Sequence, residues 1–196
     1  MKIIGRRQEI KELEQCERAE KSELVCVYGR RRVGKTFLVE QTFAGSFAFR
    51  ATGVEGGNTR QQLKAFHQRL KEHGDETRTI PKDWFEAFSR LDQVLARKDT
   101  VLSPHNKKIV FLDEFPWFAT ARSDFLMAFG EFWNRRGTES GDYLFIICGF
   151  ATSWNARCHS NWQMEHSAEL LKIWSNAVIS LNIRERVKKS SGLDRL

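Results

Sequence analysis

The sequence contains Gly29-Arg30-Arg31-Arg32-Val33-Gly34-Lys35-Thr36, which matches the pattern G-x-x-x-x-G-K-[ST] at every fixed position. The segment follows an apolar run at 23–28 and precedes a segment of helical character at 37–40. The glycines allow the backbone to bend so that successive N–H groups point inward, and the following helix adds the positive end of its dipole. We therefore expect residues 29–36 to hold the phosphates of a nucleotide, ATP.

Two side chains of this loop have defined chemical tasks. Lys35 is expected to reach the β- and γ-phosphate oxygens, and the Thr36 hydroxyl is expected to ligate Mg²⁺. Three further arginines, Arg30, Arg31 and Arg32, exceed what the pattern requires. They could reach phosphate, a partner subunit or nucleic acid, or point into solvent. We favour solvent or a partner, because the backbone of the loop already surrounds the phosphates.

A second motif supplies carboxylates. The apolar run at 109–112 ends in Asp113 and Glu114, which places both at the carboxyl edge of a sheet, where ligands bind in such folds. Asp113 is suited to hold Mg²⁺ through its water shell, and Glu114 to polarise the water that attacks the γ-phosphate. An apolar run followed by two acids is common by itself. Its pairing with the upstream loop makes a catalytic interpretation the better one.

Strand-like and helix-like segments alternate along the chain. Continuous apolar runs, typical of strands buried on both faces, occur at 23–28, 109–112 and 143–148, with a weaker candidate at 46–51. Helical spacing occurs at 7–19, 63–70, 84–95 and 125–133, and loops are expected at 53–58 and 100–106. This alternation predicts an α/β fold, specifically a P-loop NTPase with three α/β/α layers around a central parallel sheet.

Composition limits the other possibilities. A chain of 196 residues fits one domain, and no apolar run approaches the length of about 20 residues that a membrane helix needs. The N-terminus lacks the features of a secretory signal, so we expect a cytoplasmic protein. The net charge of +7 suits anionic partners, although a solvated basic surface explains it equally well. The four cysteines show no metal-binding spacing and are expected to be reduced and structural.

With both motifs placed, the sequence resembles the archaeal-type P-loop ATPases, which are related to the AAA+ and STAND nucleotide switches. The matching segments are Ile4-Gly5-Arg6-Arg7-Gln8-Glu9-Ile10, Tyr28 to Thr36, Phe111-Leu112-Asp113-Glu114-Phe115-Pro116-Trp117 and Ile147-Cys148-Gly149-Phe150-Ala151-Thr152-Ser153-Trp154. The resemblance covers an ATPase core at 1–155. It implies that the strand at 143–148 lies between those at 23–28 and 109–112, and that Gly5 and Arg6 lie near the adenine.

The sequence departs from this family in two places. Family members usually carry a small polar residue where this chain has Phe150, so Thr152 or Ser153 would have to sense the γ-phosphate, unless they cap a helix near Trp154. The family's helical lid and later domains are not recognisable, and residues 156–196 form a divergent C-terminal segment. Residues 177–183 alternate like a strand and could supply a fifth strand beside the first.

These observations support a Mg²⁺-dependent ATP hydrolase coupled to a protein or nucleic-acid partner or to another copy of the chain. The alternative is a non-hydrolysing ATP-dependent switch or assembly module; a small-molecule kinase fits worse, because no acceptor base is assignable. Isolated chains are expected to turn ATP over slowly, because a partner can supply an arginine to the transition state. Arg135, Arg136 and Arg157 are the candidates for such an arginine. The dense aromatic residues at 115–133 are expected to form core, with a partner surface second.

Overall fold

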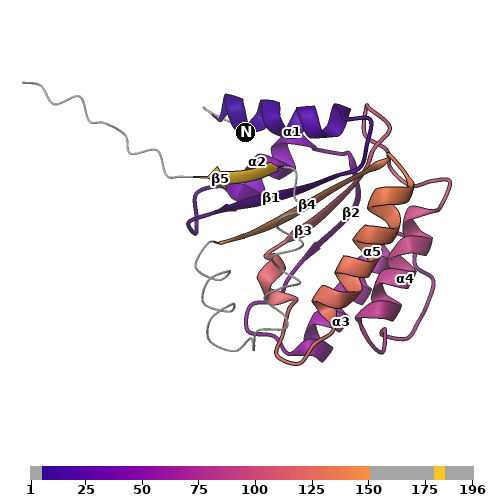
Figure 1. Ribbon diagram of the computed structural model, residues 1–196. Coiled ribbons are helices and arrows are strands. Elements are labelled where there is room, and N and C mark those ends of the chain that lie inside the picture. Colours follow the sequence, from indigo (N-terminus) through magenta and orange to yellow (C-terminus); the bar gives the residue numbers. More distant parts are fainter. Residues whose placement is uncertain (1–5, 151–178, 184–196) are drawn as a thin grey trace, which may run out of the picture.

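The centre of the molecule is a five-stranded, all-parallel sheet with the strand order β2-β3-β4-β1-β5 (Figure 1). The computed structural model describes residues 6–150 and 179–183. The strands are β1 (Glu23–Gly29), β2 (Phe47–Thr52), β3 (Lys108–Asp113), β4 (Tyr143–Phe150) and β5 (Ile179–Ile183). The four strands expected at 23–28, 46–51, 109–112 and 143–148 are all present.

The pairing of β4 determines where the functional loops meet. β4 lies between β1 and β3, as the resemblance to P-loop ATPases implied. Its Cys148 pairs with Val27 of β1, and its Ile147 pairs with Leu112 of β3. Because all strands are parallel, the loops that follow β1, β2 and β3 leave the sheet at the same edge, which is the carboxyl edge.

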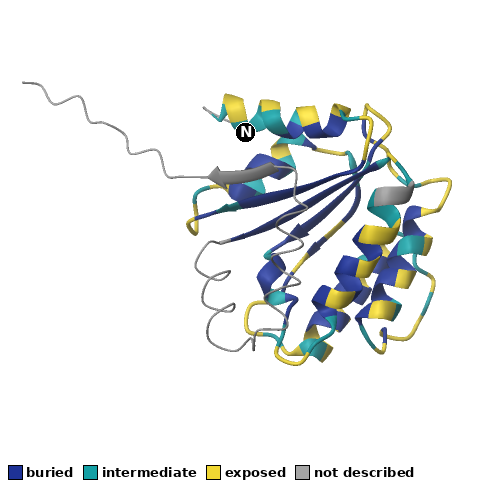
Figure 2. Ribbon diagram, in the orientation of Figure 1, coloured by how far each residue is buried: buried dark blue, intermediate teal, exposed yellow. Residues whose placement is uncertain are grey.

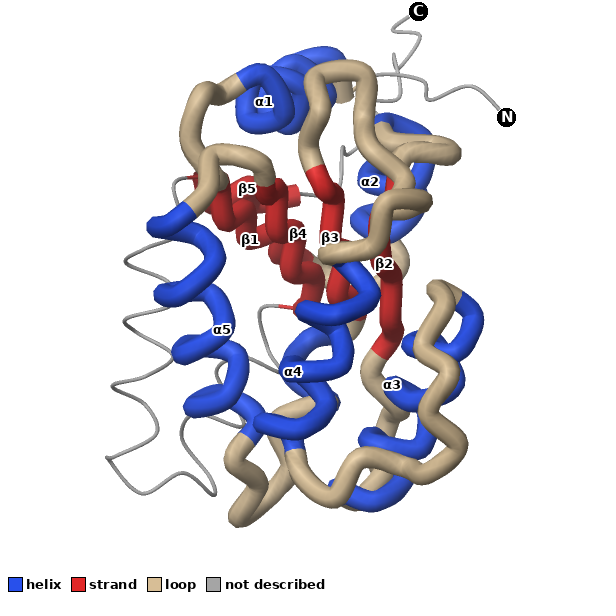
Figure 3. The backbone as a smooth tube through the Cα atoms, turned by 90° about the vertical axis from the view of Figure 1, so that its right-hand side faces the viewer, coloured by secondary structure: helices blue, strands red, loops and turns tan. Residues whose placement is uncertain are grey.

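Helices cover both faces of the sheet, which gives the three expected layers (Figure 3). One face carries α1 (Arg7–Arg18) and α2 (Lys35–Thr42). The other carries α3 (Thr59–Glu72), α4 (Trp84–Leu95) and α5 (Phe125–Glu139). A short 3-10 helix, η1 (Phe115–Trp117), follows β3.

Buried residues lie on the sheet and on the helices of both faces (Figure 2), and the two cores that they form differ in composition. Under α1 and α2 the core is mostly aliphatic. Under α3, α4 and α5 it is aromatic: the Trp84 and Phe125 rings lie 4.7 Å apart, and the Phe88 and Phe132 rings 5.3 Å apart. The aromatic residues of the segment 115–133 are buried here, apart from the partly exposed Trp117. The core interpretation of that segment is therefore confirmed.

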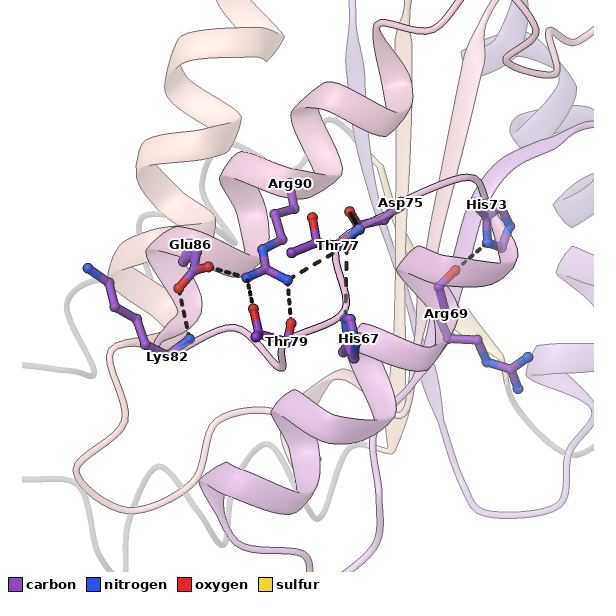
Figure 4. A network of polar contacts seen from close by, with 9 residues as sticks. All are labelled: His67, Arg69, His73, Asp75, Thr77, Thr79, Lys82, Glu86 and Arg90. Carbon is purple, nitrogen blue, oxygen red and sulfur yellow. Dashed lines mark hydrogen bonds and ion pairs between the residues drawn. The ribbon is translucent and has the colours of Figure 1, made fainter.

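A polar network ties the connection between α3 and α4 to both helices (Figure 4). The Arg90 guanidinium donates to the Thr79 carbonyl at 2.6 Å and pairs with Glu86. Asp75 lies 3.8 Å from Arg90 and 3.9 Å from the Nδ1 atom of His67. The side chains of Arg90, Asp75 and His67 are nearly inaccessible to solvent. The network satisfies a buried arginine and holds residues 75–83 against the helices.

The C-terminal segment contributes one described element. β5 pairs in parallel with β1, from Val25 opposite Ile179 to Gly29 opposite Ile183, within the segment where a fifth strand was expected. β1 therefore has a neighbour on each side. The division into a core at 1–155 and a segment at 156–196 remains a prediction. Among the described residues, no helix is long and apolar enough to cross a membrane.

Candidate nucleotide site

The loop between β1 and α2 has the backbone that a phosphate-binding loop requires. Gly29 and Gly34 have φ angles of 152° and 81°, in the region that favours glycine. Arg32 also has a positive φ, 62°, which costs a non-glycine residue on the order of 1 kcal/mol. α2 begins at Lys35, directly after Gly34, so the free N–H groups of its first turn adjoin the loop. A helix N-terminus and a bent glycine loop thus meet at one point, which suits an anion.

Lys35 lies inside this loop. Its side chain is buried, and its Nζ atom donates to the carbonyl oxygens of Arg30 at 2.8 Å and Gly29 at 3.4 Å. Both acceptors belong to the loop itself. The ammonium group can therefore exchange either of these carbonyls for a phosphate oxygen while it stays within the loop.

Thr36 and Asp113 meet although 77 positions separate them in the sequence. The Thr36 hydroxyl donates to Oδ2 of Asp113 at 2.8 Å, and Oδ1 of Asp113 accepts the Glu114 backbone N–H at 2.9 Å. Adjacent ligand oxygens of an octahedral Mg²⁺ lie about 2.9 Å apart, given metal–oxygen distances of about 2.0–2.1 Å. The hydroxyl and the carboxylate thus have the chemistry and the spacing that fit Mg²⁺ or its water shell.

Glu114 occupies a strained and partly desolvated position. Its φ is 49°, in the left-handed region, and among the described residues its buried Oε2 atom has no hydrogen-bond partner. Burial raises the pKa of this carboxyl, and the neighbouring Asp113 raises it further, whereas Lys35 and Arg31 oppose the shift. A carboxylate whose pKa is raised and whose oxygen is unsatisfied is suited to accept a proton from a water molecule.

Gly53 was not recognised as a site residue from the sequence. It follows β2, and its N–H donates to the Asp113 carbonyl at 3.0 Å. A Cβ atom at Gly53 would lie 2.6 Å from the Glu114 carbonyl oxygen and 2.8 Å from Cβ of Trp117. The close approach of two backbones therefore requires glycine here. The available signal was a glycine directly after a strand, in a loop expected from its glycines and polar residues.

Cys148 was likewise missed. The β3–β4 register places it beside Asp113, one residue beyond the Leu112–Ile147 pair. Its thiol is buried and hydrogen-bonds to the Asp113 side chain. Burial raises the pKa of this thiol well above its ordinary value, and the Asp113 carboxylate raises it further. Cys148 thus packs behind the carboxylate as a neutral donor, consistent with the structural role expected for the cysteines.

The remaining predicted residues lie at different distances from this centre. Arg6 donates to the Val33 carbonyl at 3.3 Å and pairs with Glu9 at 3.0 Å, so the start of α1 contacts the loop. Its predicted contact with adenine stays a prediction. Gly5, Thr152, Ser153 and Arg157 lie outside the described residues, and Phe150 ends β4.

Three arginines have ion-pair partners that the sequence did not indicate. Arg31, which was expected to point to solvent or a partner, is more than half exposed but pairs with Glu55 at 2.6 Å. Arg135 and Arg136 contact Asp92 of α4, at 3.5 and 2.5 Å. Both belong to the last turns of α5, which leads into the amino end of β4.

A small cavity of about 30 Å³ adjoins the Thr36–Asp113 pair at the β2 side of the sheet. Glu40, Arg50, Thr52 and Arg69 also contribute to its lining. Its volume suffices for one or two water molecules. The cavity thus provides room for water next to the carboxylate that is expected to hold hydrated Mg²⁺.

Comparison with known proteins gives structural matches without sequence matches. No family model matches the sequence, and no curated protein matches it. The Walker-type ATPase PABY2304 of Pyrococcus abyssi superposes with a TM-score of 0.50 at 15% identity, over 95% of this chain and 55% of that chain. A STAND protein with a tetratricopeptide repeat sensor, PH0952 from Pyrococcus horikoshii, has a TM-score of 0.43 at 14% identity, over 89% and 28%.

The similarity to the Pyrococcus abyssi protein concerns the fold. This chain spans about half the length of that ATPase, and their identity of 15% carries no information about individual residues. The parallel sheet, its strand order and the loop between β1 and α2 were established above independently of the match. The chain therefore has the fold of a P-loop ATPase core.

Proposed function

We propose that this chain binds Mg²⁺-ATP at the β1–α2 loop and hydrolyses it. The observation that carries the proposal is the meeting of Thr36 with Asp113 and Glu114 in front of a glycine-bent loop that contains Lys35. Each group suits a different portion of one substrate. The loop and Lys35 suit the phosphates, the Thr36–Asp113 pair suits the metal, and Glu114 suits the attacking water.

The proposed reaction needs few groups. The loop N–H groups and Lys35 bind the β- and γ-phosphates, while Thr36 and Asp113 would hold Mg²⁺, which neutralises charge on the phosphate oxygens when bound. Glu114 orients a water molecule and accepts its proton as the water oxygen bonds to the γ-phosphorus. The bond from the γ-phosphorus to the bridging oxygen breaks, and ADP leaves with that oxygen. The products are ADP and inorganic phosphate.

The decisive experiment replaces the proposed base. Glu114→Gln should keep ATP affinity, because an amide can occupy the same space, but should lower phosphate release by about 100-fold or more, because it accepts no proton. ATP affinity is measured by calorimetry and phosphate release by a coupled assay. Full turnover in this variant would show that another group orients the water.

The same experiment addresses the non-hydrolysing switch. If the wild-type chain binds Mg²⁺-ATP and releases no phosphate even at high protein concentration, the switch replaces the hydrolase as the proposal. Coupling to a protein or nucleic-acid partner is a further element of the proposal, and the net charge of +7 suits an anionic partner.

A further inference from the structure

An ion pair links the phosphate loop to the loop that follows β2. Nη2 of Arg31 lies 2.6 Å from Oε1 of Glu55, and both side chains are more than half exposed. Neither residue type is needed by the phosphate-loop pattern or by a β2–α3 connection. We therefore look for the role of the pair in its position beside the proposed nucleotide site.

The loop at 53–58 holds Glu55 in a defined place beside the site. At its start, Gly53 is fixed against the backbone of Asp113 and Glu114. The fully buried Gln62 side chain accepts from the Val54 N–H at 2.9 Å and donates to the Val54 carbonyl at 2.7 Å. Glu55 thus follows a residue whose N–H and carbonyl are both anchored. The backbone of Glu55 is therefore held at the rim of the site, and its exposed carboxylate lies within reach of Arg31.

The position of Glu55 shows on which side of the site this pair lies. Glu55 follows Gly53 by two positions, and the Gly53 backbone lies against the backbone of Asp113 and Glu114. Because Arg31 pairs with Glu55, its guanidinium lies on the side of the loop where Asp113 and Glu114 meet. This is the end at which the γ-phosphate would react.

The strength of the pair favours exchange on nucleotide binding. An exposed salt bridge contributes about 0–1 kcal/mol. A triphosphate presents several anionic oxygens, to which a guanidinium can bind in bidentate fashion and more strongly than to a hydrated carboxylate. The contact between Arg31 and Glu55 is thus weak enough to be replaced when ATP arrives.

We propose that Arg31 is a further catalytic residue, which leaves Glu55 and contacts the γ-phosphate during hydrolysis. The inference rests on the ATP hydrolysis proposed above. It places within the chain the positive charge that was expected from a partner's arginine. Glu55 holds that charge away from the phosphate-binding position in the ATP-free state, so it restrains the reaction.

Three variants and one matched control test this role. Arg31→Ala removes the charge, Arg31→Lys keeps the charge without the bidentate geometry, and Glu55→Gln removes the restraint. Asp99→Asn is the control, because it breaks a comparable exposed pair, Asp99 with Arg97 at 2.9 Å, in the connection that leads to the amino end of β3. Each variant is assayed for the melting temperature, the ATP affinity, kcat, and the affinity for the transition-state mimic ADP–aluminium fluoride with Mg²⁺.

The expected results differ for each variant. Arg31→Ala should lower kcat and the affinity for ADP–aluminium fluoride by about 100-fold, with a much smaller effect on ATP affinity, because transition-state charge is what the guanidinium meets. Arg31→Lys should recover a fraction of both losses. Glu55→Gln should raise kcat by up to about fivefold, the equivalent of the roughly 1 kcal/mol that an exposed pair can contribute. Asp99→Asn should match the wild type.

Two results would overturn the inference while leaving the proposed function intact. One is a wild-type kcat and unchanged ADP–aluminium fluoride affinity in Arg31→Ala. The other is a Glu55→Gln variant that turns ATP over more slowly than Asp99→Asn at equal melting temperature. A wild-type chain that neither binds ATP nor releases phosphate would instead overturn the proposed function, and this inference with it.

Discussion

A lysine is buried at the carboxyl edge of the sheet, where the strands end, and another at the amino edge, where they begin. The two lysines differ in the carbonyls to which they donate. At the carboxyl edge, Lys35 donates to Gly29 and Arg30, which belong to its own loop. At the amino edge, Lys107 is equally buried, but its Nζ atom donates to the carbonyls of Lys21, at 2.8 Å, and Gly141. These two acceptors come from different connections, α1–β1 and α5–β4. Lys107 therefore joins separate regions of the chain, whereas the two carbonyls that accept from Lys35 belong to one loop.

This difference distinguishes a proposed ligand-binding lysine from a lysine that holds two segments of the fold together. Releasing Lys107 would separate the two connections that its hydrogen bonds join and would leave its buried ammonium group without these acceptors, which costs about 1–3 kcal/mol. Releasing Lys35 frees two carbonyls of one loop, and the proposed nucleotide phosphates would offer the ammonium new acceptors. A buried lysine is thus not by itself a sign of function; the location of its acceptors decides.

The largest expected effect is at the carboxyl edge. Lys35→Ala should weaken Mg²⁺-ATP binding by about 100-fold or more, because it removes charge-assisted hydrogen bonds worth about 1.5–3 kcal/mol each. Isothermal titration calorimetry measures the affinity, and the melting temperature should change little. Unchanged affinity would remove the basis for assigning phosphate binding to this loop, and with it the contrast between the two lysines.

An intermediate effect is expected when glycine is replaced by alanine, once at the carboxyl edge and once at the amino edge. Gly53→Ala would place a Cβ 2.6 Å from the Glu114 carbonyl, and Gly141→Ala would place one 2.3 Å from the Glu20 carbonyl. We expect Gly53→Ala to lower kcat by about tenfold or more, because displacement of a catalytic group by a fraction of an ångström is costly. Gly141→Ala should instead lower the free energy of unfolding by about 1–3 kcal/mol.

Steady-state phosphate release and urea unfolding distinguish the two glycine variants. If Gly141→Ala reduces kcat as much as Gly53→Ala at a temperature where both are folded, the two edges are coupled. The comparison between a catalytic and a structural edge would then no longer hold.

The smallest effect concerns a buried acid at the amino edge. Glu23 is almost inaccessible, its Oε2 atom has no hydrogen-bond partner among the described residues, and Lys21 lies 3.9 Å from its other oxygen. Burial raises the pKa of Glu23, although Lys21 and Lys107 oppose the shift. The folded state thus holds the proton more tightly than the unfolded chain does. Ionised Glu23 therefore destabilises the fold.

Glu23→Gln should accordingly melt slightly higher than the wild type at neutral pH. Stability of the wild type falls as the pH rises from the ordinary glutamate pKa of 4.5 through the raised folded value, so the difference should grow over that window and vanish below it. Thermal unfolding at a series of pH values measures it. A variant that melts lower than the wild type at pH 7 would show that the two lysines outweigh burial.

Several features could be predicted because their causes are local. β1, β3 and β4 were recognisable as continuous apolar runs, because a strand that is buried on both faces lacks the alternation of apolar and polar residues. Their observed limits differ from the expected ones by at most two residues at either end. The strand order was implied by a resemblance to known ATPases, because apolar runs alone do not specify which strand pairs with which.

Other features of the site depend on contacts between distant segments. The Arg31–Glu55 pair joins two loops 24 positions apart, and Cys148 meets Asp113 through the register of β3 and β4. Glu55 reads in the sequence as an ordinary loop glutamate, and Cys148 as an ordinary core residue. Their roles follow from which loops leave the sheet side by side, and residue periodicity carries no such information.

The sequence alone determined the bent loop at 29–36 to which we assign phosphate binding, because glycines, lysine and the start of a helix are contiguous and their backbone preferences act within a few residues. It also determined the alternation of strands and helices, and hence the α/β class. The tertiary structure alone decided that Thr36 contacts Asp113 and that Gly53 touches the Glu114 backbone. These contacts arise when parallel strands bring their carboxyl ends to one edge, where positions far apart in the chain become neighbours.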